Sequence, residues 1–127
     1  MKNFILTITL ITICFTAIAQ TNKEKALIKV REAIKLMDNG SIDASIAILE
    51  ECEKLDPENY LYPYEKAFAY LKKKEYDKSI KILKKTLKYK NINDQVYRML
   101  GNAYSFAGKK KKAIKTYEQG MKKFPNA

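Results

Sequence analysis

DQVYRMLGNAYSFAGKKKKAIKTYEQGMKKFPNA, residues 94–127, is the stretch of sequence that decides the fold of this chain. It carries conspicuous residues at regular intervals, namely Tyr97, Leu100, Gly101, Tyr104, Ala113, Tyr117 and Pro125. Intervals of three and four residues place side chains on one face of a helix. Weaker copies of the pattern lie 34 and 68 residues earlier, which indicates three repeats of one structural unit.

This spacing resembles that of the tetratricopeptide repeat, whose pattern is W-x₂-L-G-x₂-Y, A-x₃-F and P over 34 residues. Tyr97 and Tyr117 stand where the family has Trp and Phe. Pro57 and Pro125 share one phase of the period and so divide the chain into repeats 26–59, 60–93 and 94–127. The resemblance implies an all-α fold, a right-handed α-solenoid of three stacked helix-turn-helix hairpins.

The residues predict the same architecture without the family. Apolar residues recur at helical spacing, and turn-forming residues such as Asp38-Asn39-Gly40-Ser41 separate the periodic stretches. No alternating strand pattern is visible. Six helices are predicted, at 26–38, 42–55, 61–73, 76–89, 94–107 and 110–123. Small residues share one phase on the first helices (Ala33, Ala67, Gly101) and one on the second helices (Ser45, Ser79, Ala113), which allows close approach within each hairpin.

Residues 1–19 have the layout of a secretory signal peptide, with Lys2, an apolar run and a small-x-small site ending at Ala19. Cleavage there predicts an exported protein, periplasmic or secreted, with a short polar lead-in at 20–25. The alternative is a retained N-terminal anchor. A lipoprotein signal at Cys14 is disfavoured because Ile13 is not small. Cys52 would then be the single cysteine, either a reactive thiol or, as we favour, a small buried residue.

The resemblance implies a concave groove lined by the first helix of each repeat, which binds a protein or peptide partner. The candidate groove residues are Leu27, Val30, Ile34, Met37, Leu61, Tyr64, Phe68, Leu71, Arg98, Asn102, Ser105 and Phe106. The groove grades from apolar in repeats one and two to polar in repeat three. Arg98 and Asn102 match residue types with which some relatives hold a C-terminal carboxylate, but repeats one and two lack such partners. An apolar groove for an amphipathic helix or extended segment is therefore favoured.

Charge is distributed unevenly along the chain. Repeat one has a net charge of −4, repeat two +7 and repeat three +6. Two lysine runs at predicted turns form a basic edge, namely Lys72, Lys73, Lys74, Lys109, Lys110, Lys111 and Lys112. This edge is either an ordinary solvated surface or a site for an acidic partner or an anionic membrane surface. Nucleic acid is disfavoured, because the chain is expected to be exported and Arg is scarce.

No catalytic residue, metal site or cofactor is predicted. The chain has no His, and its four glycines are isolated. Two hypotheses remain, a protein-interaction module that uses the groove and a basic surface-binding or assembly protein that uses the lysine edge. Ile114 and Met121 lie on the last helix, which no further repeat follows, and they suggest a homodimer through this end.

Overall fold

The computed structural model of this chain describes the backbone of residues 2–127 and the side chains of residues 17–18 and 20–127. Met1 and most side chains of the predicted signal peptide, Cys14 included, lie outside the described residues. The described backbone forms six helices and no strand: α1 (Lys2–Asp38), α2 (Ile42–Leu55), α3 (Leu61–Lys72), α4 (Tyr76–Thr86), α5 (Asp94–Phe106) and α6 (Lys110–Lys123). The all-α prediction is confirmed.

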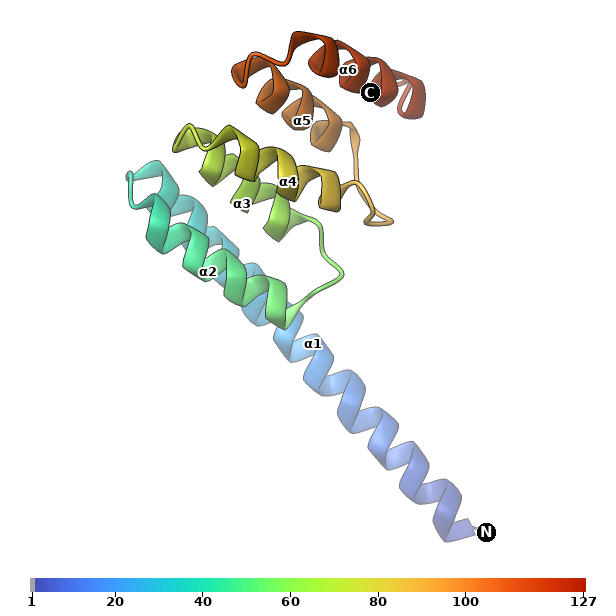
Figure 1. Ribbon diagram of the computed structural model, residues 1–127. Coiled ribbons are helices and arrows are strands. Elements are labelled where there is room, and N and C mark those ends of the chain that lie inside the picture. Colours follow the sequence, from blue (N-terminus) through green and yellow to red (C-terminus); the bar gives the residue numbers. More distant parts are fainter. Residues whose placement is uncertain (1) are drawn as a thin grey trace.

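The helices pair in chain order as α1–α2, α3–α4 and α5–α6, and neighbouring hairpins meet through α2–α3 and α4–α5. Figure 1 shows the three hairpins stacked side by side, with the N-terminal part of α1 running on beyond them. The chain is thus a solenoid of three helical hairpins, as the repeat pattern predicted. No helix in the described part of the chain is both long and apolar enough to cross a membrane.

Four boundaries differ from the sequence prediction. Two differ by a single residue, since α3 ends at Lys72 and α5 at Phe106. The first helix does not begin at residue 26 but continues through the polar residues 20–25 toward the N-terminus. The fourth helix ends at Thr86 and not at residue 89. Beyond Thr86 the backbone bonds tighten, since the Tyr89 N–H donates to the Thr86 carbonyl over 3.1 Å in a three-residue turn.

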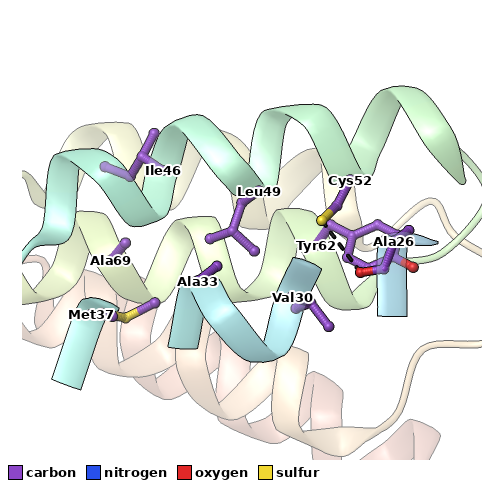
Figure 2. Packing of buried hydrophobic residues seen from close by; sticks show 9 residues of the cluster. All are labelled: Ala26, Val30, Ala33, Met37, Ile46, Leu49, Cys52, Tyr62 and Ala69. Carbon is purple, nitrogen blue, oxygen red and sulfur yellow. Dashed lines mark hydrogen bonds between the residues drawn. The ribbon is translucent and has the colours of Figure 1, made fainter. Parts of the chain in front are cut away.

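The small residues predicted to lie between paired helices are buried. Ala33 and Ala67 are fully buried on the first helices, and Ser45 and Ser79 are fully buried on the second. One apolar cluster joins α1, α2 and α3, and a second joins α3, α4 and α5. Figure 2 shows Leu49 of α2 beside Ala33 of α1 in the first cluster. The interior is therefore continuous from hairpin to hairpin, as stacking requires.

The turn inside each hairpin repeats one backbone conformation with the 34-residue period. Gly40 and Gly108 have φ angles of 84° and 73°, and Lys74, at the equivalent position of repeat two, has a φ of 62°. In this left-handed region a side chain approaches the following carbonyl, whereas glycine meets no such obstacle. In repeat two, therefore, a lysine adopts the backbone conformation that glycine adopts in repeats one and three.

Replacing Lys74 with glycine is expected to stabilise the protein by about 1 kcal/mol, because it relieves this backbone conformation. Urea unfolding followed by circular dichroism measures the change. Lys73→Gly is the matched control, since Lys73 has an ordinary φ of −75° and glycine there should destabilise. A Lys74→Gly chain less stable than the parent would contradict the expectation.

Candidate functional site

A hollow lies between α3 and α5, the first helices of repeats two and three. Its volume is about 630 Å³, and it is lined by Tyr64, Phe68, Leu71, Lys72, Gln95, Arg98, Met99, Asn102 and Phe106. Six of the groove residues predicted from sequence converge here, namely Tyr64, Phe68, Leu71, Arg98, Asn102 and Phe106. They come from two helices of successive repeats that run side by side in the stack.

Exposed aromatic side chains give this hollow its apolar character. Phe68 on α3 is 39% exposed and Phe106 on α5 is 63% exposed, while Met99, which also lines the hollow, is 9% exposed. The Phe106 ring stacks on Tyr76 with 5.9 Å between ring centroids, which holds it at one end of the hollow. Large apolar side chains that remain exposed to solvent are typical of a surface that binds an apolar segment of a partner.

Two cations border this apolar surface. The Lys72 Nζ lies 5.6 Å from the centroid of the Phe68 ring and 3.9 Å from a carboxylate oxygen of Asp38. The Arg98 Nε lies 3.1 Å from the Asp94 carboxylate, while the Arg98 side chain remains 63% exposed. The hollow thus offers positive charge together with an apolar surface.

Asn102 and Tyr64 add hydrogen-bonding groups. The Tyr117 hydroxyl donates to the Asn102 Oδ1 over 2.7 Å, which leaves the amide NH₂ of Asn102 to donate elsewhere. Burial raises the pKa of the Tyr64 phenol, and the Glu65 carboxylate adds to this effect while Arg98 opposes it. Tyr64 is therefore a neutral hydroxyl near pH 7.

The structure corrects two predicted groove residues. Val30 and Met37 are 3% and 2% exposed and belong to the first apolar cluster. They share a stripe with Ala26 and Ala33, which spacings of four, three and four residues turn toward α2 and α3. A partner cannot reach them, so the groove is narrower in repeat one than the sequence predicted.

The remaining predicted groove residues lie outside the hollow between α3 and α5. Leu27 is 45% exposed and borders a separate hollow beside the α2–α3 loop. Ile34 and Leu61 are partly buried against the first apolar cluster. Ser105 is exposed on α5. Sequence reasoning also missed Met99, although its spacing from Gln95 and Asn102 places all three on one face of the helix.

The basic edge is partly neutralised within the protein. The Lys73 Nζ lies 2.5 Å from an Asp43 oxygen, and the Lys109 Nζ lies 2.6 Å from an Asp77 oxygen. Each of these pairs joins a hairpin turn to the second helix of the preceding repeat. Half or more of each Asp side chain stays exposed, so the pairs contribute little stability individually. They do reduce the positive charge that the edge presents to a partner.

Cys52 is fully buried on α2, as the favoured interpretation predicted. Its thiol donates to the Ala26 carbonyl over 3.5 Å, and burial raises the pKa of the thiol. A thiol held neutral in an apolar interior is a packing residue and not a nucleophile. Within the described residues, no cluster of His, Cys, Asp and Glu is placed to hold a metal ion.

Helical hairpins stacked around an accessible groove define an α-solenoid of the repeat type. The tetratricopeptide repeat family model matches residues 36–59 and 94–122, within repeats one and three. Two of the three repeats thus match the tetratricopeptide repeat family, and the chain has the tetratricopeptide repeat fold.

Solved structures share the fold at low sequence identity. The second TPR of Spaghetti (RPAP3), bound to the HSP90 peptide SRMEEVD, is 24% identical with a TM-score of 0.72, over 81% of this chain and 95% of that one. The N-terminal domain of stress-induced protein-1 from C. elegans is 14% identical with a TM-score of 0.75, over 81% and 87%. YrrB, described as a TPR protein with an unusual peptide-binding site, is 21% identical with a TM-score of 0.68, over 85% and 56%.

Proposed function

We propose that this chain is a protein-interaction module that binds an apolar segment of a partner protein in the hollow between α3 and α5. The observation that carries the proposal is the convergence of accessible Phe68 and Phe106 with Arg98 and Asn102 on one concave surface. An amphipathic helix or an extended peptide would place its apolar side chains over the two aromatic rings. The fold supports this role, since the second TPR of Spaghetti, a similar solved structure, holds a bound HSP90 peptide.

The border of the hollow specifies the chemistry of the partner segment. Lys72 and Arg98 favour acidic side chains beside the apolar anchors, and the Asn102 NH₂ can donate to a carbonyl or carboxylate oxygen. In repeat two, Tyr64 and Phe68 occupy the positions of Arg98 and Asn102, so the polar pair is present only once. The proposed ligand is therefore an apolar segment with flanking acidic residues, and not a bare C-terminal carboxylate.

Binding through the lysine edge alone is the second function that the sequence left open. Two of its lysines, Lys73 and Lys109, already form close ion pairs within the chain. The remaining lysines would attract an acidic partner or an anionic envelope surface without orienting it. We therefore assign the edge a supporting role, which is to increase the rate of association with an acidic partner.

A photoreactive residue in the groove tests the proposed function. Benzoylphenylalanine at position 68 is expected to crosslink one partner protein in the cells that produce this chain, and Tyr64→Ala in the same chain should abolish that crosslink. The matched control carries the photoreactive residue at Ala47, which is exposed on α2 away from the hollow. Equal crosslinking from positions 68 and 47, or insensitivity to Tyr64→Ala, would reject the groove as the binding site.

Export is part of the proposal and rests on the layout of residues 1–19. Cleavage after Ala19 would leave the repeats as an exported module, periplasmic or secreted. N-terminal sequencing of the chain purified from the producing cells checks this point, and the expected first residue is Gln20. A first residue of Met1 would contradict cleavage and favour a retained anchor.

A further inference from the structure

The outward-facing side of α4 consists almost entirely of lysine. Its inward side carries Ser79, Leu83 and Thr86, which are fully buried. A helix has about 3.6 residues per turn, so the positions that face away from these three are 77, 78, 81, 84, 85 and 88. Asp77 is paired with Lys109, and the other five positions are exposed lysines, namely Lys78, Lys81, Lys84, Lys85 and Lys88. We call these five residues the lysine face.

The repeat fold does not require lysine at these five positions. Their equivalents on α2 are Ala44, Ala47, Glu50, Glu51 and Lys54. Their equivalents on α6 include three lysines and one glutamate, namely Lys112, Lys115, Lys122 and Glu118. The outward side of the second helices is therefore most positive on α4, is less positive on α6, and is not positive on α2.

Most of the lysine face is not neutralised within the protein. Lys78 is paired with Glu75, and its Nζ lies 5.3 Å from the centroid of the Tyr70 ring. Among residues 20–127, whose side chains the structure describes, no carboxylate pairs with the other four lysines. These four lie three or four residues apart, where like charges destabilise a helix. A local cost that nothing in the fold offsets is typical of a functional surface.

The residue types on the lysine face indicate what kind of anion it suits. Neither arginine nor an aromatic residue occurs among its members, whereas arginine binds single phosphates in a fixed geometry and aromatic rings stack on nucleic-acid bases. From Lys78 to Lys88 the face runs about 15 Å along the helix axis. Several flexible ammonium groups spread over this length suit a surface of many anionic headgroups better than one ordered phosphate.

We infer that the lysine face of α4 binds an anionic lipid surface, with the lysines at the equivalent positions of α6 extending the contact. This function is additional to the proposed groove and does not depend on it. The inward side of α4 packs on α3 and α5, and α4 lies in the middle of the stack (Figure 1). The lysine face therefore points away from the two helices that line the hollow, so contact with lipid leaves the groove open to a partner.

Sedimentation of the full chain with phospholipid vesicles tests this inference. The parent is expected to bind vesicles made of equal parts of phosphatidylglycerol and phosphatidylcholine, less at high salt than at low salt, and not vesicles of phosphatidylcholine alone. Lys81→Gln/Lys84→Gln/Lys88→Gln should weaken this binding at least about tenfold. The matched control, Lys25→Gln/Arg31→Gln/Lys35→Gln, removes the same charge from exposed positions on α1 and should bind within about threefold of the parent. Circular dichroism should show unchanged helix content in both variants, because the replaced side chains are exposed.

Three results would overturn the inference. Equal weakening in the two variants would show that net charge governs binding and that the lysine face has no special part in it. Equal binding to vesicles with and without phosphatidylglycerol would assign the lipid contact to the apolar residues 1–19. A parent chain that binds polyuridylate but not the anionic vesicles would assign the lysine face to a nucleic acid. None of these measurements involves the groove, so their failure is distinct from a failure of the crosslink at position 68.

Discussion

Gly101→Ala is expected to destabilise the protein by about 2 kcal/mol, although alanine is the better helix former. A Cβ atom at this position would overlap the ring of Tyr117, which crosses from α6 against the backbone of α5. The Tyr117 hydroxyl is also anchored on Asn102 at 2.7 Å. The ring must therefore give up this position to make room, and it loses its packing and its hydrogen bond.

Repeats one and two suggest a second substitution that would compensate for Gly101→Ala. The equivalent pair is Ala33 with Leu49 in repeat one and Ala67 with Leu83 in repeat two, and all four residues are fully buried. A Gly101→Ala/Tyr117→Leu chain reproduces that pair in repeat three. It should regain most of the lost stability, even though Tyr117→Leu alone leaves a gap over Gly101.

Urea unfolding of the parent, the two single variants and the double variant measures this coupling. We expect an interaction free energy of about 2 kcal/mol in favour of the double variant. Strictly additive effects would show that the two residues do not share the space between α5 and α6.

At alkaline pH, the ionisation of Tyr62 is expected to lower the stability of the protein. Its side chain is fully buried, and its hydroxyl donates to an Asp56 oxygen over 3.1 Å. Burial, assisted by the Asp56 carboxylate, raises the pKa of Tyr62 to about 12 from its ordinary value of about 10. The folded chain therefore keeps the phenol proton after the unfolded chain has released it.

The direction of the pH dependence of stability follows, since the unfolded chain releases the Tyr62 proton at a lower pH than the folded chain. The stabilisation is fully present below pH 10, where Tyr62 is neutral in both states, and it is lost as the pH rises toward 12. The free energy of unfolding should fall by about 3 kcal/mol over this interval through Tyr62 alone. Unfolding of the parent and of Tyr62→Phe across this pH range isolates the contribution, because the lysines and other tyrosines titrate in both chains. Equal pH slopes would contradict it.

The fold could be predicted from sequence because the repeat is recognised by short intervals between residues along the chain. Residues such as Leu100, Gly101 and Tyr104 report helix faces and hairpin turns within one 34-residue unit, and the period then supplies the stacking. Lys74 shows where this reasoning stops. The lysine run indicated a charged turn, but only the backbone shows that its last lysine occupies the left-handed position of Gly40 and Gly108.

The candidate site could be predicted only in part. Equivalent positions of the repeat predicted Phe68 and Phe106 in one groove, and both line the hollow between α3 and α5. The repeat pattern could not distinguish an accessible residue from one buried against a neighbouring helix. The prediction that Val30 lines the groove was wrong for this reason, because the burial of Val30 depends on how α1 packs against α2 and α3. Ion pairs such as Lys73 with Asp43 join residues 30 positions apart, and their geometry depends on the stacking angle.

The affinity of the crosslinked partner's binding segment for two double variants tests the groove proposal most directly. Phe68→Ala/Phe106→Ala removes both accessible rings of the hollow, while Ile114→Ala/Met121→Ala removes two comparably exposed apolar residues elsewhere. Calorimetric titration at a chain concentration that excludes self-association should show binding at least about a hundredfold weaker for the first variant and unchanged for the second. Equal affinities for the two variants, or loss of binding only in the second, would contradict the assignment of the groove between α3 and α5.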